Sequence, residues 1–263
     1  RPLTAFAFGI AYFAFAITHL GTPSLTVCAV LAAAGAVLVR SLGAPELAAI
    51  NLAGFYLNYF PIFRLALSAN PAQAFPAADF WYSLAAATAV HGVYAWLTPR
   101  GDEEGSLPWL DAALSLSAVL YAALFYSQVG AFGPGNAVAV LLCLAGVLGG
   151  LSSLTGRGEG KALPQVQGLL SAAVTALALA KLDGPAQQLW GFALASTVFG
   201  LMGLWLKRPS MERYGLAMAG LAALVHIGHP LEAESMKLAM GAGLAYLGTS
   251  CYLLAAIGGD GSK

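Results

Sequence analysis

Residues 135–154 read GNAVAVLLCLAGVLGGLSSL, a stretch that contains no charged side chain. A helix rises about 1.5 Å per residue, so a stretch of this length matches the hydrocarbon core of a bilayer, which is roughly 30 Å thick. In lipid, each backbone N–H and C=O group must find its partner within its own segment, and an α-helix meets this condition. The stretch therefore predicts a membrane-spanning helix.

The rest of the chain has the same character. Of its 263 residues, 59% are hydrophobic and only 9% are charged, which is too little charge to cover a soluble domain of this size. We therefore expect an all-α, polytopic helix bundle in a lipid bilayer. Breaks rich in Gly and Pro separate the apolar runs, and they predict about ten transmembrane helices, at residues 4–20, 25–43, 45–66, 79–97, 109–128, 135–154, 163–181, 186–206, 212–228 and 235–257. The alternative is eight spans with two interfacial helices.

Positive charges are divided unequally between the two sides that ten spans define. Nine of the twelve Lys and Arg residues fall on the side that holds both termini, and only Arg64, Lys181 and Lys237 fall on the other. Because loops rich in Lys and Arg stay on the cytoplasm-like side, both termini are predicted to face the cytoplasm, the stroma or the matrix. A removed organellar transit peptide would explain a chain that starts at Arg1, and so would trimming of a bacterial chain. Of these two origins we favour an organellar membrane such as the thylakoid.

The chain matches itself when it is shifted by 109 positions. The matches include the pairs Trp81 and Trp190, Thr88 and Thr197, and Trp96 and Trp205. Small loop insertions extend the match, so that Gly35 falls on Gly146, and the repeating unit becomes four helices. The predicted domains are a first repeat at 1–107, a second repeat at 108–209 and a half repeat of two helices at 210–263. The copies run parallel, unlike the inverted repeats of many transporters.

One position of this repeat carries side chains that can bind a metal. It lies at the end of the first helix of each unit and holds His19, Gln128 and His226. Imidazole is a common metal ligand, and an amide oxygen suits a magnesium centre, so the three residues are candidate axial ligands of chlorophyll or haem. The alternative is a polar residue at the membrane interface, near a glycine that ends the helix.

His91 lies well inside the fourth predicted span, where its repeat equivalent is Gly200. Ionisable groups within a membrane usually face protein, water or a ligand. His91 is therefore a further candidate for binding a tetrapyrrole or carrying a proton, with Thr88 and Tyr94 as candidate hydrogen-bond partners. A hydrogen-bonded helix contact is the alternative.

The third predicted span has a polar face. Asn51 and Asn58 are seven residues apart and share one side of a helix. Arg64 follows near the end of the span, after a proline that can kink it. Together with His91, these residues are candidates for lining a transport path, whereas asparagine in a bundle also serves to join helices.

Several function classes find no support in the sequence. The net charge is zero and no basic stripe occurs, so no nucleic acid partner is expected. The chain contains no HExxH, GxSxG or Walker motif and no paired intramembrane carboxylates. We therefore predict that it is not an enzyme, with no catalytic residues and no dedicated metal centre.

Two hypotheses of function remain. The first is a noncatalytic subunit or linker of a larger membrane complex, such as a photosynthetic or respiratory assembly. In this hypothesis the chain contacts lipids and other membrane subunits and binds pigments. The second is a small-solute transporter or channel. Short loops, few charges and abundant small residues favour the first.

Overall fold

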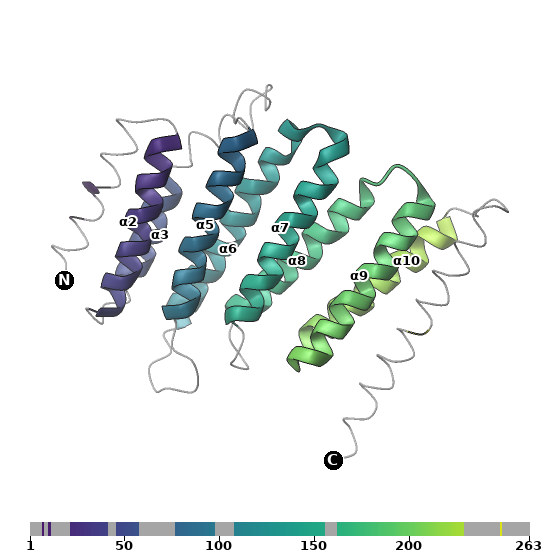
Figure 1. The fold of residues 1–263 in the computed structure, drawn as a ribbon. Coiled ribbons are helices and arrows are strands. Elements are labelled where there is room, and N and C mark those ends of the chain that lie inside the picture. The colour runs from purple at the N-terminus through teal and green to yellow at the C-terminus, as the bar shows by residue number, and fades with distance from the viewer. Residues whose placement is uncertain are drawn as a thin grey trace, which may run out of the picture. The chain divides into compact units, whose positions relative to one another are not determined.

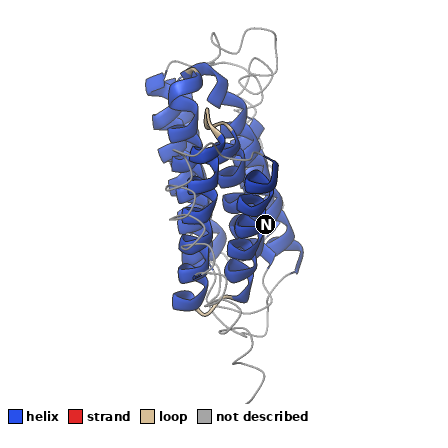
Figure 2. Ribbon diagram, turned by 90° about the vertical axis from the view of Figure 1, so that its right-hand side faces the viewer, coloured by secondary structure: helices blue, strands red, loops and turns tan. Residues whose placement is uncertain are grey.

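A computed structural model describes residues 22–41, 46–57, 77–97, 108–155 and 162–228, together with the isolated positions 7, 10, 11 and 248. All the elements in these residues are helices (Figure 1), and no strand occurs among them (Figure 2). The predicted all-α class is confirmed for this part of the chain.

The α-helices of the described residues coincide with eight of the ten predicted spans. They are α2 (Thr22–Ser41), α3 (Glu46–Leu57), α5 (Ala77–Leu97), α6 (Pro108–Gln128), α7 (Pro134–Thr155), α8 (Ala162–Ala180), α9 (Pro185–Leu206) and α10 (Pro209–Gly228), with a short 3₁₀ helix η2 (Val129–Phe132) after α6. The second half of the predicted span 45–66 lies outside the described residues. So do the predicted spans 4–20 and 235–257, apart from isolated positions.

Three of these helices are long and apolar enough to cross a membrane. They are Gly135–Thr155, which forms nearly all of α7, together with α8 and α9. A chain with such helices is compatible with a lipid bilayer. The count of ten spans, and the alternative of eight, remain predictions.

Prolines set the starts of four helices. Pro108, Pro134, Pro185 and Pro209 are the first residues of α6, α7, α9 and α10. At this position a proline loses no helical hydrogen bond, and its fixed φ angle suits the helix. The prolines that mark breaks in the sequence are therefore the points at which new helices begin.

The chain divides into two compact units, residues 1–170 and 171–263, with the boundary inside α8. In the first unit, α2 contacts α3 and α5, α5 contacts α7, and α3 contacts α6. Helices α2, α5 and α7 thus form one layer, and α3 and α6 lie behind it (Figure 1). The predicted division into repeats at 1–107, 108–209 and 210–263 remains a prediction.

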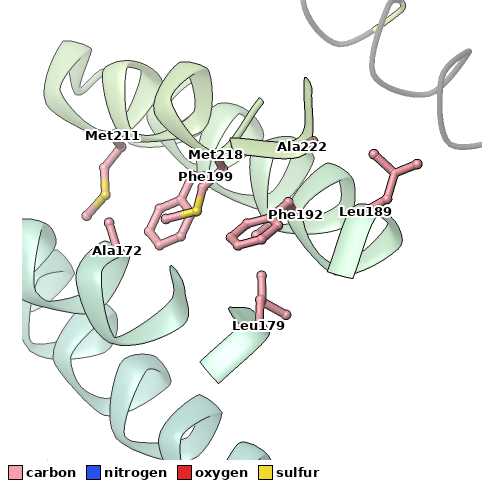
Figure 3. Packing of buried hydrophobic residues seen from close by; sticks show 9 residues of the cluster. Ala172, Leu179, Leu189, Phe192, Phe199, Met211, Met218 and Ala222 are labelled. Atoms are coloured by element: carbon pink, nitrogen blue, oxygen red, sulfur yellow. The ribbon is translucent and has the colours of Figure 1, made fainter. Parts of the chain in front are cut away.

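In the second unit, α9 and α10 form a tightly packed hairpin. A Cβ atom on Gly215 of α10 would lie 3.0 Å from the backbone O of Ser196 and from the backbone N of Gly200, both on α9. Small residues let helix backbones approach this closely. The buried apolar cluster of this unit (Figure 3) comprises Ala172, Leu179, Leu189, Phe192, Ala195, Phe199, Met211, Met218 and Ala222.

The turn between α9 and α10 is closed by backbone hydrogen bonds. Arg208 N–H donates to Gly203 O at 2.7 Å, and Lys207 N–H donates to Leu204 O at 3.2 Å. These two bonds are those of a Schellman motif, which satisfies the last carbonyls of a helix. Lys207 takes the left-handed position, with φ of 53°, that glycine usually fills. The motif orders a residue whose side chain is exposed to solvent.

Candidate functional site

Asn51 joins three helices of the first unit. Its side chain is buried on α3, and its Nδ2 donates to Ala32 O on α2 at 2.8 Å and to the Tyr94 hydroxyl on α5 at 2.7 Å. Gly35 on α2 makes room for it, because a Cβ at that position would lie 2.6 Å from Asn51 Oδ1. Asn51 therefore acts as a contact between helices.

His91 lies in the next polar contact, between α5, α3 and α6. Its Nε2 is 2.5 Å from the Tyr56 hydroxyl on α3. Its ring packs edge to face against that of Tyr121 on α6, with the ring centroids 5.1 Å apart. The Tyr121 hydroxyl lies 2.9 Å from Thr88 Oγ1 on α5. We call Tyr56, Thr88, His91 and Tyr121 the His91 cluster.

Aromatic rings extend the His91 cluster towards the end of α6. Tyr121 packs on Phe125, with centroids 5.0 Å apart, and Phe125 packs edge to face on Phe80 of α5 at 5.6 Å. Phe80 also contacts Phe132 of η2, with centroids 4.7 Å apart. Edge-to-face pairs of this kind stabilise a contact beyond the area that they bury. The rings therefore hold α5 and α6 together.

The hydrogen-bond partners within the His91 cluster differ from those that the sequence indicates. Thr88 and Tyr94 are the candidates from helical spacing, but His91 Nε2 forms its hydrogen bond with the Tyr56 hydroxyl. The contacts of Tyr56 and Tyr121 with His91 could not be predicted from helical periodicity, because periodicity relates residues of one helix and these two lie on other helices. Aromatic residues are also common at the membrane interface, so the sequence alone does not single these two out as partners of a histidine.

The residues at the proposed ligand position have different surroundings. Gln128 is buried at the end of α6, where its Nε2 donates to Ser127 Oγ at 3.4 Å, and its Oε1 has no hydrogen-bond partner among the described residues. His226 is exposed in the last turn of α10. His19, Asn58 and Arg64 lie outside the described residues. The structure therefore joins Asn51 to Tyr94 and His91 to Tyr56. Gln128 belongs to the first unit and His226 to the second.

The side chain of Asp111 on α6 accepts hydrogen bonds from the backbone of α8. It lies in the first turn of α6, and its carboxylate oxygens accept the backbone N–H groups of Ala162 at 2.6 Å and Leu163 at 3.1 Å. These are the first two residues of α8, whose amides have no partner within their own helix. A negative charge is also favourable at the N-terminus of a helix. Asp111 therefore caps α8.

The buried polar side chains described above form hydrogen bonds between helices. No group of three or more His, Cys, Asp or Glu side chains that could hold a metal ion occurs in this part of the chain. Comparison with family models, with curated proteins and with solved structures finds no match to this chain.

Proposed function

We propose that the protein is a noncatalytic polytopic subunit of a larger membrane complex. The observation that carries this proposal is the placement of the polar residues. Asn51 and His91, two candidates for a transport path, are buried and hydrogen-bonded to neighbouring helices. Polar side chains used in this way join helices within a bundle.

The exposed apolar side chains support the same proposal. On α6 they include Leu116 and Leu120, and on α9 they include Leu194 and Leu201. Each of these apolar faces needs lipid or another apolar protein surface to cover it. We therefore propose lipids and other membrane subunits as the partners of this protein.

The proposed setting is an energy-converting membrane of an organelle, with the thylakoid favoured, in a photosynthetic or respiratory assembly. The unequal division of Lys and Arg supports an orientation with both termini on the stromal, matrix or cytoplasmic side. The absence of catalytic motifs from the sequence is consistent with a supporting role.

Pigment binding by this subunit would use Gln128 first. Its Oε1 is buried without a hydrogen-bond partner among the described residues, and an amide oxygen can serve a magnesium centre. His91 is a poorer candidate for chlorophyll or haem because its Nε2 is already engaged with Tyr56. His226 is exposed and would bind only a group held from outside α10.

A native gel and an absorption spectrum of one sample test the proposal. The protein is extracted from its own membrane in mild detergent, and we expect a species much larger than the 26.9 kDa chain. Ser115 on the same helix is a matched control, because its buried Oγ also has no hydrogen-bond partner among the described residues. Chlorophyll or haem bands that weaken in Gln128→Leu but persist in Ser115→Ala would support the pigment role. A colourless species of monomer or dimer size would contradict both the subunit and the pigment proposals.

A small-solute carrier is the second candidate, and the His91 cluster favours it. The cluster places four polar side chains next to one another across α3, α5 and α6, and such groups can carry protons or ions through a membrane. Flux into liposomes that contain the purified chain tests this candidate. Uptake that falls in Asn51→Ala, Asn58→Ala or His91→Ala would replace the subunit proposal.

A further inference from the structure

Helix α9 carries an apolar face that ends in a tryptophan on each side. The exposed residues on this face are Trp190, Leu194, Val198, Leu201 and Trp205. Their spacing of three or four residues places them along one side of the helix. The two tryptophans are separated by about 22 Å along the axis at 1.5 Å per residue. Tryptophan is enriched at both membrane interfaces, so this face has the form of a lipid-facing surface.

The two ends of this face differ in charge. Near Trp190, the turn before α9 carries Lys181 and Asp183, whose charges offset one another. Near Trp205, Lys207 in the turn after α9 and Arg213 near the start of α10 have exposed side chains. The only acidic residue between them is Glu212, which is half-buried and packs against Gly203. The Trp205 end is therefore cationic.

The cationic end is also ordered. Trp205 is 83% exposed, the largest exposed fraction among the large apolar side chains of the described residues. Two residues later, the Schellman motif holds Lys207 in its left-handed conformation. Arg208 is half-buried, and burial lowers the pKa of its guanidinium. Lys207 and Arg213 are consequently the two cations best placed to meet a ligand.

We propose that the turn between α9 and α10, together with the start of α10, binds an anionic phospholipid, with the phosphate headgroup at Lys207 and Arg213 and the acyl chains along the Leu201 and Trp205 side of α9. A basic cluster attracts anionic lipid, and an exposed indole ring settles at the headgroup level. This site is independent of the choice between subunit and carrier, because it requires only that α9 lies in a bilayer.

Quenching of tryptophan fluorescence by brominated lipids tests the site. The full chain is reconstituted into phosphatidylcholine vesicles that contain phosphatidylglycerol, with bromine on the acyl chains of one lipid or the other at equal bromolipid content. The Trp205 signal is obtained as the difference between the wild-type chain and Trp205→Phe. We expect stronger quenching when the bromine is on phosphatidylglycerol.

Two charge variants complete the experiment. Each cation near the surface enriches anionic lipid roughly fivefold, so Lys207→Gln with Arg213→Gln should remove most of the preference for phosphatidylglycerol. The matched control is Lys181→Gln at the other end of α9, which should keep the preference. Both sites are exposed, and circular dichroism checks that each variant remains helical. Equal quenching of Trp205 by the two bromolipids in the wild-type chain would overturn the proposal. So would a loss of the phosphatidylglycerol preference in Lys181→Gln as large as that in the double variant.

Discussion

A single amide, that of Asn51, connects α3 to both α2 and α5. Its two donated hydrogen bonds end on a backbone carbonyl and on the Tyr94 hydroxyl. Side-chain hydrogen bonds between helices in membrane proteins contribute about 0.6 kcal/mol on average and up to about 1.7 kcal/mol. At the residue scale, the stability of the first unit therefore depends on a few buried polar groups and on the space that Gly35 leaves for one of them.

Replacing Asn51 with leucine should lower stability. Both hydrogen bonds are lost, at a cost of about 1–2 kcal/mol, because the Tyr94 hydroxyl stays buried. The measurement is the thermal midpoint in detergent. Ser115→Ala on α6 is the control, since the buried Ser115 Oγ has no partner to lose among the described residues, and its midpoint should be unchanged or higher. Equal losses in both variants would contradict the role of Asn51.

Gly35→Ala should be destabilising, whereas Gly146→Ala should not. The new methyl group at position 35 would overlap Asn51, and overpacking of this kind costs about 1–3 kcal/mol. At Gly146, its counterpart in the predicted repeat, no atom lies within 4 Å of the added Cβ, so alanine should gain roughly 0.5–1 kcal/mol from its higher helix propensity. Thermal midpoints measure both effects. If Gly146→Ala lowers the thermal midpoint as much as Gly35→Ala does, overlap with Asn51 is not the cause of the destabilisation at position 35.

At the scale of elements, helix ends are completed by groups outside the helix itself. Asp111 of α6 caps α8. At the other end of α8, Gln188 Nε2 of α9 donates to Ala180 O at 3.2 Å and to Leu182 O at 2.9 Å. Helix ends buried in a membrane protein need such partners, because the last carbonyls and first amides have none in the helix.

Asp111→Ala should loosen the start of α8. The loss of a capping side chain costs about 1 kcal/mol, so hydrogen exchange at the amides of Ala162 and Leu163 should become faster by roughly fivefold. Mass spectrometry of the peptide that contains these residues measures the rate. Asp183→Asn, at an exposed carboxylate in the turn after α8, is the control and should leave the rate unchanged. Unchanged exchange in Asp111→Ala would exclude the capping role.

At the scale of the whole molecule, the question is which side of the membrane each turn occupies. The charge distribution predicts that the turn after α9 faces the side of the termini and that the turn before α9 faces the opposite side. The length and apolar composition of α9 are compatible with a crossing between them.

Cysteine labelling in sealed vesicles measures this orientation. In a chain whose three native cysteines are replaced by alanine, Ser210→Cys and Asp183→Cys should react with an impermeant maleimide from opposite sides. Labelling after the vesicles are opened is the control for reactivity. If both positions react from the same side of sealed vesicles, α9 does not cross the membrane.

The amino-acid sequence by itself determines the helical class and most of the helix boundaries, because long uncharged runs and prolines are local signals. Pro134 and Pro185, for example, begin α7 and α9 within one residue of the predicted starts. The candidate polar residues Asn51, His91 and Gln128 are also visible in the sequence. The ten-span count, the repeat and the function remain predictions.

Only the tertiary structure decides what these polar residues touch. Tyr56 meets His91 across 35 positions of the chain, and Asp111 meets Ala162 across 51. Nearly every helix is apolar on all sides, so periodicity does not reveal which face meets a neighbour. Pairing between helices depends on the packing of side chains from distant segments, and this is why Asn51 and Asp111 acquire their roles only in the folded chain.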